Sequence, residues 1–193
     1  MRMSVALPVP IFRSDTQADV LAALFLSPES VTVGDLSLRL SIPYPTVHRE
    51  VSRLVEAAIL IEDSRVGNYR FYKPNVDSPL YNALQELIEV SAGPIPTLRA
   101  IFSGIDGIQW IAIYGSWAHR LLGNRGVIPN DLDLMVVGHP SAREVNKASL
   151  ELSKRFGWTV NPTIMTSSEW KQDSPFLTQV RSGGLIPIIG KPE

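Results

Sequence analysis

Residues 109–116 read Gln-Trp-Ile-Ala-Ile-Tyr-Gly-Ser, and residues 131–137 read Asp-Leu-Asp-Leu-Met-Val-Val. The first is an apolar run of strand length that ends in a Gly-Ser turn, and the second is an apolar run that begins with two carboxylates. Alternate residues of a strand share a face, so Asp131 and Asp133 are expected to point the same way. Adjacent carboxylates repel each other unless a divalent cation lies between them, and hard oxygen ligands favour Mg²⁺ or Mn²⁺. The two stretches therefore predict a metal site beside a turn that can hold phosphate.

The residues after the turn, 117–122, are expected to form a helix, with Gly115 and Ser116 at its N-terminus. Free N–H donors and the positive end of the helix dipole suit a triphosphate there, and Ser116 adds a hydroxyl donor. An Asp-x-Asp sequence alone would indicate only a turn before a strand. Coupled to the preceding strand, turn and helix, it predicts a site for a nucleoside triphosphate with Mg²⁺ or Mn²⁺.

This ordered set resembles the nucleotidyltransferase superfamily of the DNA polymerase β type, especially the minimal nucleotidyltransferase domains of prokaryotic toxin–antitoxin pairs. The resemblance covers about residues 95–193, including the expected helix, glycine stop and short strand of residues 174–190. It implies that Gly115 and Ser116 bind the nucleotide's phosphates and that Asp131 and Asp133 are catalytic metal ligands. It also implies in-line nucleotidyl transfer with pyrophosphate leaving, and a third carboxylate on a later strand.

The later strand departs from that pattern. After a helix expected over 142–156, residues 157–164 carry Asn161 where the resemblance calls for the third carboxylate. Asparagine can offer a metal its carbonyl oxygen, but it is uncharged and a poor base. The remaining acidic candidates, Glu169 and Asp173, lie beyond the strand. Nucleotide binding without transfer therefore stays open beside catalysis.

Other side chains near the turn are candidates for secondary roles. His119 and Arg120 form either a phosphate-side pair or a surface pair on the helix, and Arg125 in the next loop is a cation for a phosphate or a partner. The tryptophans are expected in the core or at an interface, with Trp117 also placed to rest on a base. They are Trp110, Trp117, Trp158 and Trp170.

The first half of the chain predicts three helices followed by a β-hairpin. The helices are expected from Asp15 to a stop at Pro28, over 33–40, and from Thr46 onward. The third has an apolar face at helical spacing, formed by Val47, Val51, Leu54, Val55 and Ala58. Strands are expected over 59–63 and 69–73, with the hairpin tip at 64–68.

Residues 46–60 resemble the recognition helix of winged helix-turn-helix regulators where it runs into the first wing strand, and the resemblance covers roughly residues 15–75. It implies that this helix enters the major groove of double-stranded DNA while the hairpin, the wing, lies along the adjacent backbone or minor groove. The implied DNA contacts are Tyr44, Thr46, His48, Arg49 and Arg53 on the helix and Arg65 and Arg70 on the wing. Alternatively, Arg49 and Arg53 solvate an exposed helix face beside Glu50 and Glu56.

The charge around this helix bears on assembly. Residues 44–75 hold five basic and four acidic side chains, so one copy would neutralise few phosphates. A homodimer would double the contacts, and we expect one.

The fold class expected is α/β in two domains, a winged helix followed by a nucleotidyltransferase-like mixed sheet with flanking helices. Prolines at 74, 79, 94 and 96 bracket the helical stretch 80–90. We expect a DNA-binding domain over 1–76, a connecting helix and linker over 77–96, and the nucleotidyltransferase-like domain over 97–193.

The composition excludes several other classes of protein and of functional site. The 193 residues are 45% hydrophobic, enough for a sizeable core, and the net charge of -1 gives no global argument for nucleic-acid binding. The absence of cysteine excludes disulfides, a thiolate nucleophile and a cysteine-based zinc site. The weak, proline-broken run at residues 1–10 does not resemble a signal peptide, and the apolar run 20–26 is far below a membrane span. We expect a cytoplasmic protein that does not enter membranes.

Two functions of different classes follow. The first is a DNA-binding transcriptional regulator, antitoxin-like and acting on its own operon, whose second domain binds nucleotide or a toxin-like partner protein. The alternative is an active Mg²⁺-dependent nucleotidyltransferase that moves a nucleotide onto a protein or small molecule. A further reading makes the second domain an interaction module.

Overall fold

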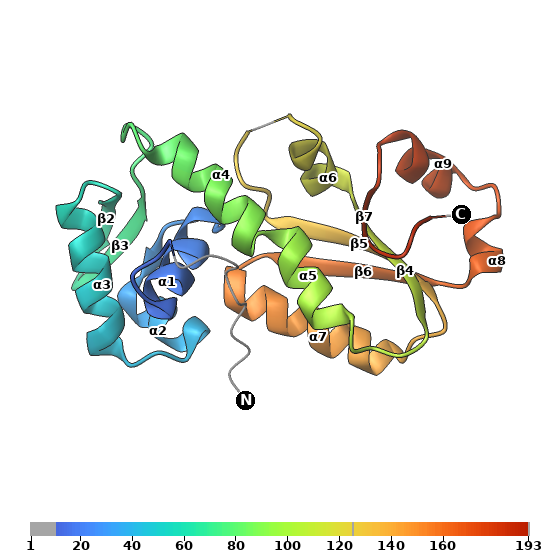
Figure 1. Ribbon diagram of the computed structural model, residues 1–193, viewed down its shortest axis with the longest axis horizontal. Coiled ribbons are helices and arrows are strands. Elements are labelled where there is room, and N and C mark those ends of the chain that lie inside the picture. The colour runs from blue at the N-terminus through green and yellow to red at the C-terminus, as the bar shows by residue number, and fades with distance from the viewer. Residues whose placement is uncertain (1–10, 125, 193) are drawn as a thin grey trace. The chain divides into compact units, whose positions relative to one another are not determined.

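The computed structural model describes residues 11–124 and 126–192, and the chain is a mixed α/β protein with two sheets (Figure 1). It divides into two compact units, Met1–Thr97 and Leu98–Glu193. The N-terminal stretch 1–10, assessed above for a signal peptide, and the candidate cation Arg125 both lie outside the described residues. In the part of the chain that is described, none of the helices combines the length and apolar character needed to cross a bilayer.

Helices of the first unit begin with polar caps where the sequence offers them. They are α1 (Asp15–Phe25), α2 (Val33–Leu40), α3 (Tyr44–Glu56) and α4 (Tyr81–Ala92). The side chains of Ser14 and Thr32 accept hydrogen bonds from the first turns of α1 and α2. α4 packs on α1, where the rings of Phe25 and Tyr81 stack with centroids 5.8 Å apart.

Helix α3 differs from the expectation at both ends. It begins at Tyr44 rather than Thr46, because a proline is tolerated in the first turn, where Pro45 lies. Its buried face contains Val47, Val51 and Leu54 as expected. Ala58 was expected on that face, but the helix ends at Glu56 and Ala58 is exposed.

The first unit also holds a small antiparallel sheet of order β1-β3-β2. Its strands are β1 (Val31–Thr32), β2 (Leu60–Val66) and β3 (Tyr69–Pro74). β2 and β3 extend further than expected, so the hairpin tip narrows to Gly67 and Asn68. β1 was not expected, because two residues are too few to produce a periodic signal.

The second unit is built on a mixed sheet of order β6-β5-β4-β7. Its strands are β4 (Ile108–Tyr114), β5 (Asp131–Gly138), β6 (Thr159–Met165) and β7 (Ile186–Ile189). β5 and β6 are parallel, as the crossover through α7 (Ala142–Phe156) requires, and the other pairs are antiparallel. The remaining helices are α5 (Pro94–Phe102), α6 (Gly115–Leu121), α8 (Ser167–Trp170) and α9 (Pro175–Ser182).

Both faces of this sheet are covered by apolar side chains. On one face, Trp110 and Met135 pack with Trp170 of α8 and with Leu177 and Val180 of α9. Elsewhere in the core, Trp117 of α6 meets the ring of Trp158 at 4.9 Å. All four tryptophans are buried, as expected, and Trp117 is fully enclosed, so the idea that it rests on a base is wrong.

The amphipathic pattern of α7 predicts that truncating two nearby leucines will have very different effects on the free energy of unfolding. Leu152→Ala removes a fully buried side chain and should lower the free energy of unfolding by about 2–5 kcal/mol. Leu150→Ala, on the same helix but 55% exposed, should change it by about 0.5 kcal/mol or less. Urea unfolding followed by tryptophan fluorescence measures this, because every tryptophan lies in the second unit. Equal losses from both variants would contradict the packing described.

Candidate functional site

The register of three adjacent strands assembles the first candidate site. Asp133 of β5 is paired with Tyr114 of β4 and with Asn161 of β6. The side-chain amide of Asn161 donates a hydrogen bond to Oδ1 of Asp133, with 3.2 Å between the two atoms. Asp131 is exposed and Asp133 half-buried, with Leu132 buried between them, which is the alternation expected of a strand.

The Gly-Ser turn lies directly against Asp133. Gly115 has a φ of +70°, and a Cβ built on it would approach Oδ2 of Asp133 to 2.5 Å. Only glycine combines this backbone conformation with so close an approach. Ser116 is exposed, and its hydroxyl lies 3.5 Å from the main-chain carbonyl oxygen of Asp131. The four residues expected to hold phosphate and metal are thus neighbours, although they come from two segments of the chain.

The electrostatics of the carboxylate pair favour a cation. Burial raises the pKa of Asp133 above its usual value of 3.8, the hydrogen bond from Asn161 opposes this, and the charge of Asp131 raises the pKa further. A divalent cation beside both carboxylates would relieve the repulsion between them. Within residues 11–124 and 126–192, however, no three side chains of the His, Cys, Asp or Glu types gather closely enough to hold a metal. The donor set is therefore two carboxylates and one amide.

Residues that surround Asp133 on the same sheet face were not expected from the sequence. The Tyr114 hydroxyl lies 3.1 Å from that of Thr163, and burial raises the pKa of Tyr114. Phe176 of α9 packs edge-to-face against the Tyr114 ring, with centroids 6.1 Å apart. Tyr114 is paired with Asp133, and Thr163 lies two positions after Asn161, so both side chains point to the same face as Asp133. The alternation of side chains along a strand could therefore have identified them.

The other acidic candidates are engaged elsewhere. Glu169 closes a capping box with Thr166 at the start of α8, and the hydrogen bond from the Thr166 backbone holds the pKa of Glu169 below its usual value. Asp173 lies 3.7 Å from a guanidinium nitrogen of Arg181. The sequence Thr-Ser-Ser-Glu at 166–169 is the capping-box signature and could have predicted α8.

The two basic side chains that follow the turn have different environments in the structure. His119 is exposed, whereas Arg120 is buried and donates to the main-chain carbonyl of Gly126. The surface-pair interpretation is therefore wrong for Arg120, which supports the loop between α6 and β5.

A second candidate surface lies on the first unit, where α3 presents polar side chains. Tyr44, His48, Arg49 and Arg53 are exposed, Thr46 is half-buried, and the rings of Tyr44 and His48 stack at 6.0 Å. Glu50, expected beside these arginines on the exposed face, is buried instead. It accepts hydrogen bonds from Arg13 and Gln17 and lies 3.8 Å from Arg53.

The hairpin contributes the other basic candidates. Arg65 and Arg70 are directly paired across β2 and β3, and Arg70 also lies 3.5 Å from a carboxylate oxygen of Glu62. Arg49 and Arg65 make no ion pair with any residue that the structure describes.

A cavity of about 590 Å³ joins the start of α2, α3 and the hairpin. Three of the expected DNA contacts, Tyr44, His48 and Arg70, line it together, whereas Arg49, Arg53, Arg65 and Thr46 lie outside its lining. Gly34, Tyr69 and Tyr72 line it as well and were missed. Tyr69, exposed on a strand next to Arg70, could have been suspected from its position alone.

Comparison with models of protein families, with curated proteins and with solved structures gives no match to this chain.

Two substitutions should move the pKa of Asp133 in opposite directions. Asp131→Asn removes a nearby negative charge and should lower it, because the ionised form is then less destabilised. Asn161→Ala removes a hydrogen bond to the ionised form and should raise it. Carboxyl ¹³C NMR during a pH titration measures both shifts. Shifts of the same sign would contradict the geometry of the site.

Proposed function

We propose that this protein is a DNA-binding transcriptional regulator whose second domain has a nucleotidyltransferase-like fold that binds a nucleotide. The observation that carries the proposal is that α3 and the hairpin, which line one cavity together, both expose arginines, of which Arg49 and Arg65 have no ion-pair partner among the described residues. Exposed guanidinium groups without an ion-pair partner suit phosphate binding, because no internal salt bridge must be broken.

The order of elements in the first unit supports a winged helix. Three helices are followed by a hairpin, and a short strand between α1 and α2 pairs with β3. Helix α3 follows α2 after a turn that starts with Ser41 in the left-handed conformation, which is how a helix-turn-helix presents its second helix. In this reading α3 is the recognition helix and the β2–β3 hairpin is the wing.

The side chains on this surface divide by chemistry. Arginine forks onto guanine edges or phosphate, so Arg49, Arg53, Arg65 and Arg70 supply affinity and readout. The hydroxyls of Tyr44 and Thr46 and the imidazole of His48 position the backbone. Because the surface also carries Glu56 and Glu62, one copy binds DNA weakly, and a homodimer doubles the phosphate contacts.

The second domain adds a nucleotide site. Gly115 and Ser116 would lie against the phosphates, and Asp131 and Asp133 would hold a divalent cation, which supplies charge neutralisation when bound. The contact between Gly115 and Asp133 and the raised pKa of Asp133 fit such a cation. Asn161 supplies an amide in place of a third negative charge, so the site favours binding over transfer. An antitoxin-like role, with a toxin-like partner or nucleotide level controlling repression of the protein's own operon, belongs to this proposal.

A second function is favoured by one observation. The two carboxylates share one face of β5, and Asp133 lies directly against the Gly-Ser turn, which is the arrangement a Mg²⁺-dependent nucleotidyltransferase needs for positioning its substrate. In that case the acceptor is a protein or small-molecule hydroxyl.

DNA binding can be tested without knowing the operator. Selection from a random duplex library should enrich one sequence, and Arg49→Ala with Arg65→Ala should weaken binding to it at least tenfold, with a salt slope smaller by about 2. Fluorescence anisotropy over a series of salt concentrations gives both values. The control, Arg143→Ala with Lys147→Ala on exposed positions of α7, removes the same charge and should bind as the unmodified protein. A library that shows no enrichment, or equal losses in both pairs, would refute the regulator.

The nucleotide site can be tested through Asn161. The unmodified protein should bind Mn²⁺ with ATP and so reduce the electron paramagnetic resonance signal of free Mn²⁺, and Asp131→Asn or Asp133→Asn should abolish this reduction. Asn161→Asp adds a third carboxylate beside Asp133 and should tighten Mn²⁺ binding about tenfold. Incubation with labelled ATP, Mg²⁺ and lysate should leave no labelled product with the unmodified protein. A product that disappears in both aspartate variants would establish the enzyme instead.

A further inference from the structure

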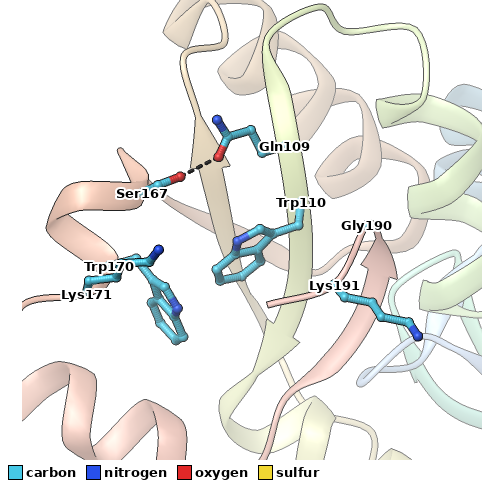
Figure 2. Close-up of a pocket in the computed structure, with 7 residues that line it drawn as sticks. All are labelled: Gln109, Trp110, Ser167, Trp170, Lys171, Gly190 and Lys191. Atoms are coloured by element: carbon cyan, nitrogen blue, oxygen red, sulfur yellow. Dashed lines mark hydrogen bonds between the residues drawn. The ribbon is translucent and has the colours of Figure 1, made fainter. Parts of the chain in front are cut away.

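A cavity of about 630 Å³ lies in the second unit, away from the carboxylate pair (Figure 2). It is bounded by Gln109 and Trp110 of β4, by Ser167, Trp170 and Lys171 around α8, and by the segment that follows β7. Its volume is within the range of pockets that bind small molecules.

The backbone that forms the cavity is specially shaped. The pairing of β4 with β5 is irregular between Ile108 and Trp110, so Gln109 stands at a bulge. A Cβ on Gly190 would overlap the carbonyl oxygen of Gln109 and lie 2.9 Å from Cβ of Trp110, and Gly190 has a φ of +63°. The chain after β7 is therefore pressed against the bulge, which brings Lys191 to the rim. β-bulges commonly re-aim side chains beside functional sites.

The wall of the cavity is aromatic and stiff. The indole rings of Trp110 and Trp170 meet edge-to-face with centroids 4.9 Å apart, and the guanidinium of Arg181 lies 4.8 Å from the centre of the Trp170 ring. Both indoles are about 95% buried, so their remaining edges form a pre-organised apolar surface. Figure 2 shows the hydrogen bond from Ser167 to Gln109 bordering these rings. A flat apolar group would cover these edges without repacking the core.

The charged residues that line the cavity are both basic. Lys171 and Lys191 line it, and no carboxylate does so among residues 11–124 and 126–192. Neither ammonium group forms an ion pair with another described residue. The chain as a whole carries a net charge of -1, so this local excess is a property of the cavity.

We propose that this cavity binds a small organic anion that carries a planar apolar group. Lys171 and Lys191 attract the anionic end from two different sides of the cavity (Figure 2), and the planar group covers the exposed edges of Trp110 and Trp170. The site is independent of the carboxylate pair, whose charge is opposite, and of the DNA-binding surface.

The tryptophans provide a built-in test. We would titrate full-length ¹⁵N-labelled protein with 2-naphthoate and follow the four indole N–H signals by NMR. The signals of Trp110 and Trp170 should shift and saturate, whereas those of Trp117 and Trp158, which pack against each other elsewhere, should not. 2-Naphthalenemethanol has the same rings without the charge, and it should bind at least fivefold more weakly.

A charge-matched pair of variants completes the test. Lys171→Gln with Lys191→Gln should weaken 2-naphthoate binding about fivefold, because each exposed ion pair contributes modestly. Lys147→Gln with Lys154→Gln, at exposed positions of α7, should leave it unchanged. Absent or unsaturated shifts, equal shifts of all four indoles, or equal binding by both variant pairs would overturn the proposal.

Discussion

The pairing of β5 with both of its neighbours is the constraint on which the second unit depends. Side chains on one face of β5, Leu132, Leu134 and Val136, are fully buried, and so are Met135 and Val137 on the other face. A slip of one residue would exchange the two faces, so the apolar pattern determines the register. That register aligns Tyr114, Asp133 and Asn161 in one row. The polar site is thus a consequence of the burial of apolar residues further along the same strand.

One face of this sheet carries opposite charges at its two ends. Asp131 and Asp133 lie at the start of β5, whereas Lys171 and Lys191 border Trp110 at the start of the antiparallel strand β4. Ala112 and Met135 lie between the two ends in the apolar layer. A layer of packed side chains therefore separates the acidic end from the basic end. At the acidic end, the amide of Asn161 donates a hydrogen bond to Asp133 without adding a third negative charge.

In the first unit, a buried acidic residue connects α3, which carries exposed arginines, to α1. Glu50 of α3 accepts hydrogen bonds from Arg13 and from Gln17 of α1. A buried carboxylate is costly unless it is fully paired, so this contact constrains how α3 packs on α1. The same helix therefore turns Glu50 inward and leaves Arg49 outward, one residue apart.

The sequence by itself determined the element types, the mixed α/β class, and the approximate positions of the main helices and strands, because apolar periodicity and turn residues act locally. It also identified Gly115, Ser116, Asp131 and Asp133 as a set, since each lies beside a strong strand or turn signal. It could not identify β1 or the start of α3, which depend on pairing with a distant strand and on a tolerated proline. Only the tertiary structure decided that Glu50 and Arg120 are buried, that Asn161 touches Asp133, and that Trp110, Trp170 and two lysines border one cavity. These facts depend on contacts between segments far apart in the chain, and local propensity carries no information about such contacts.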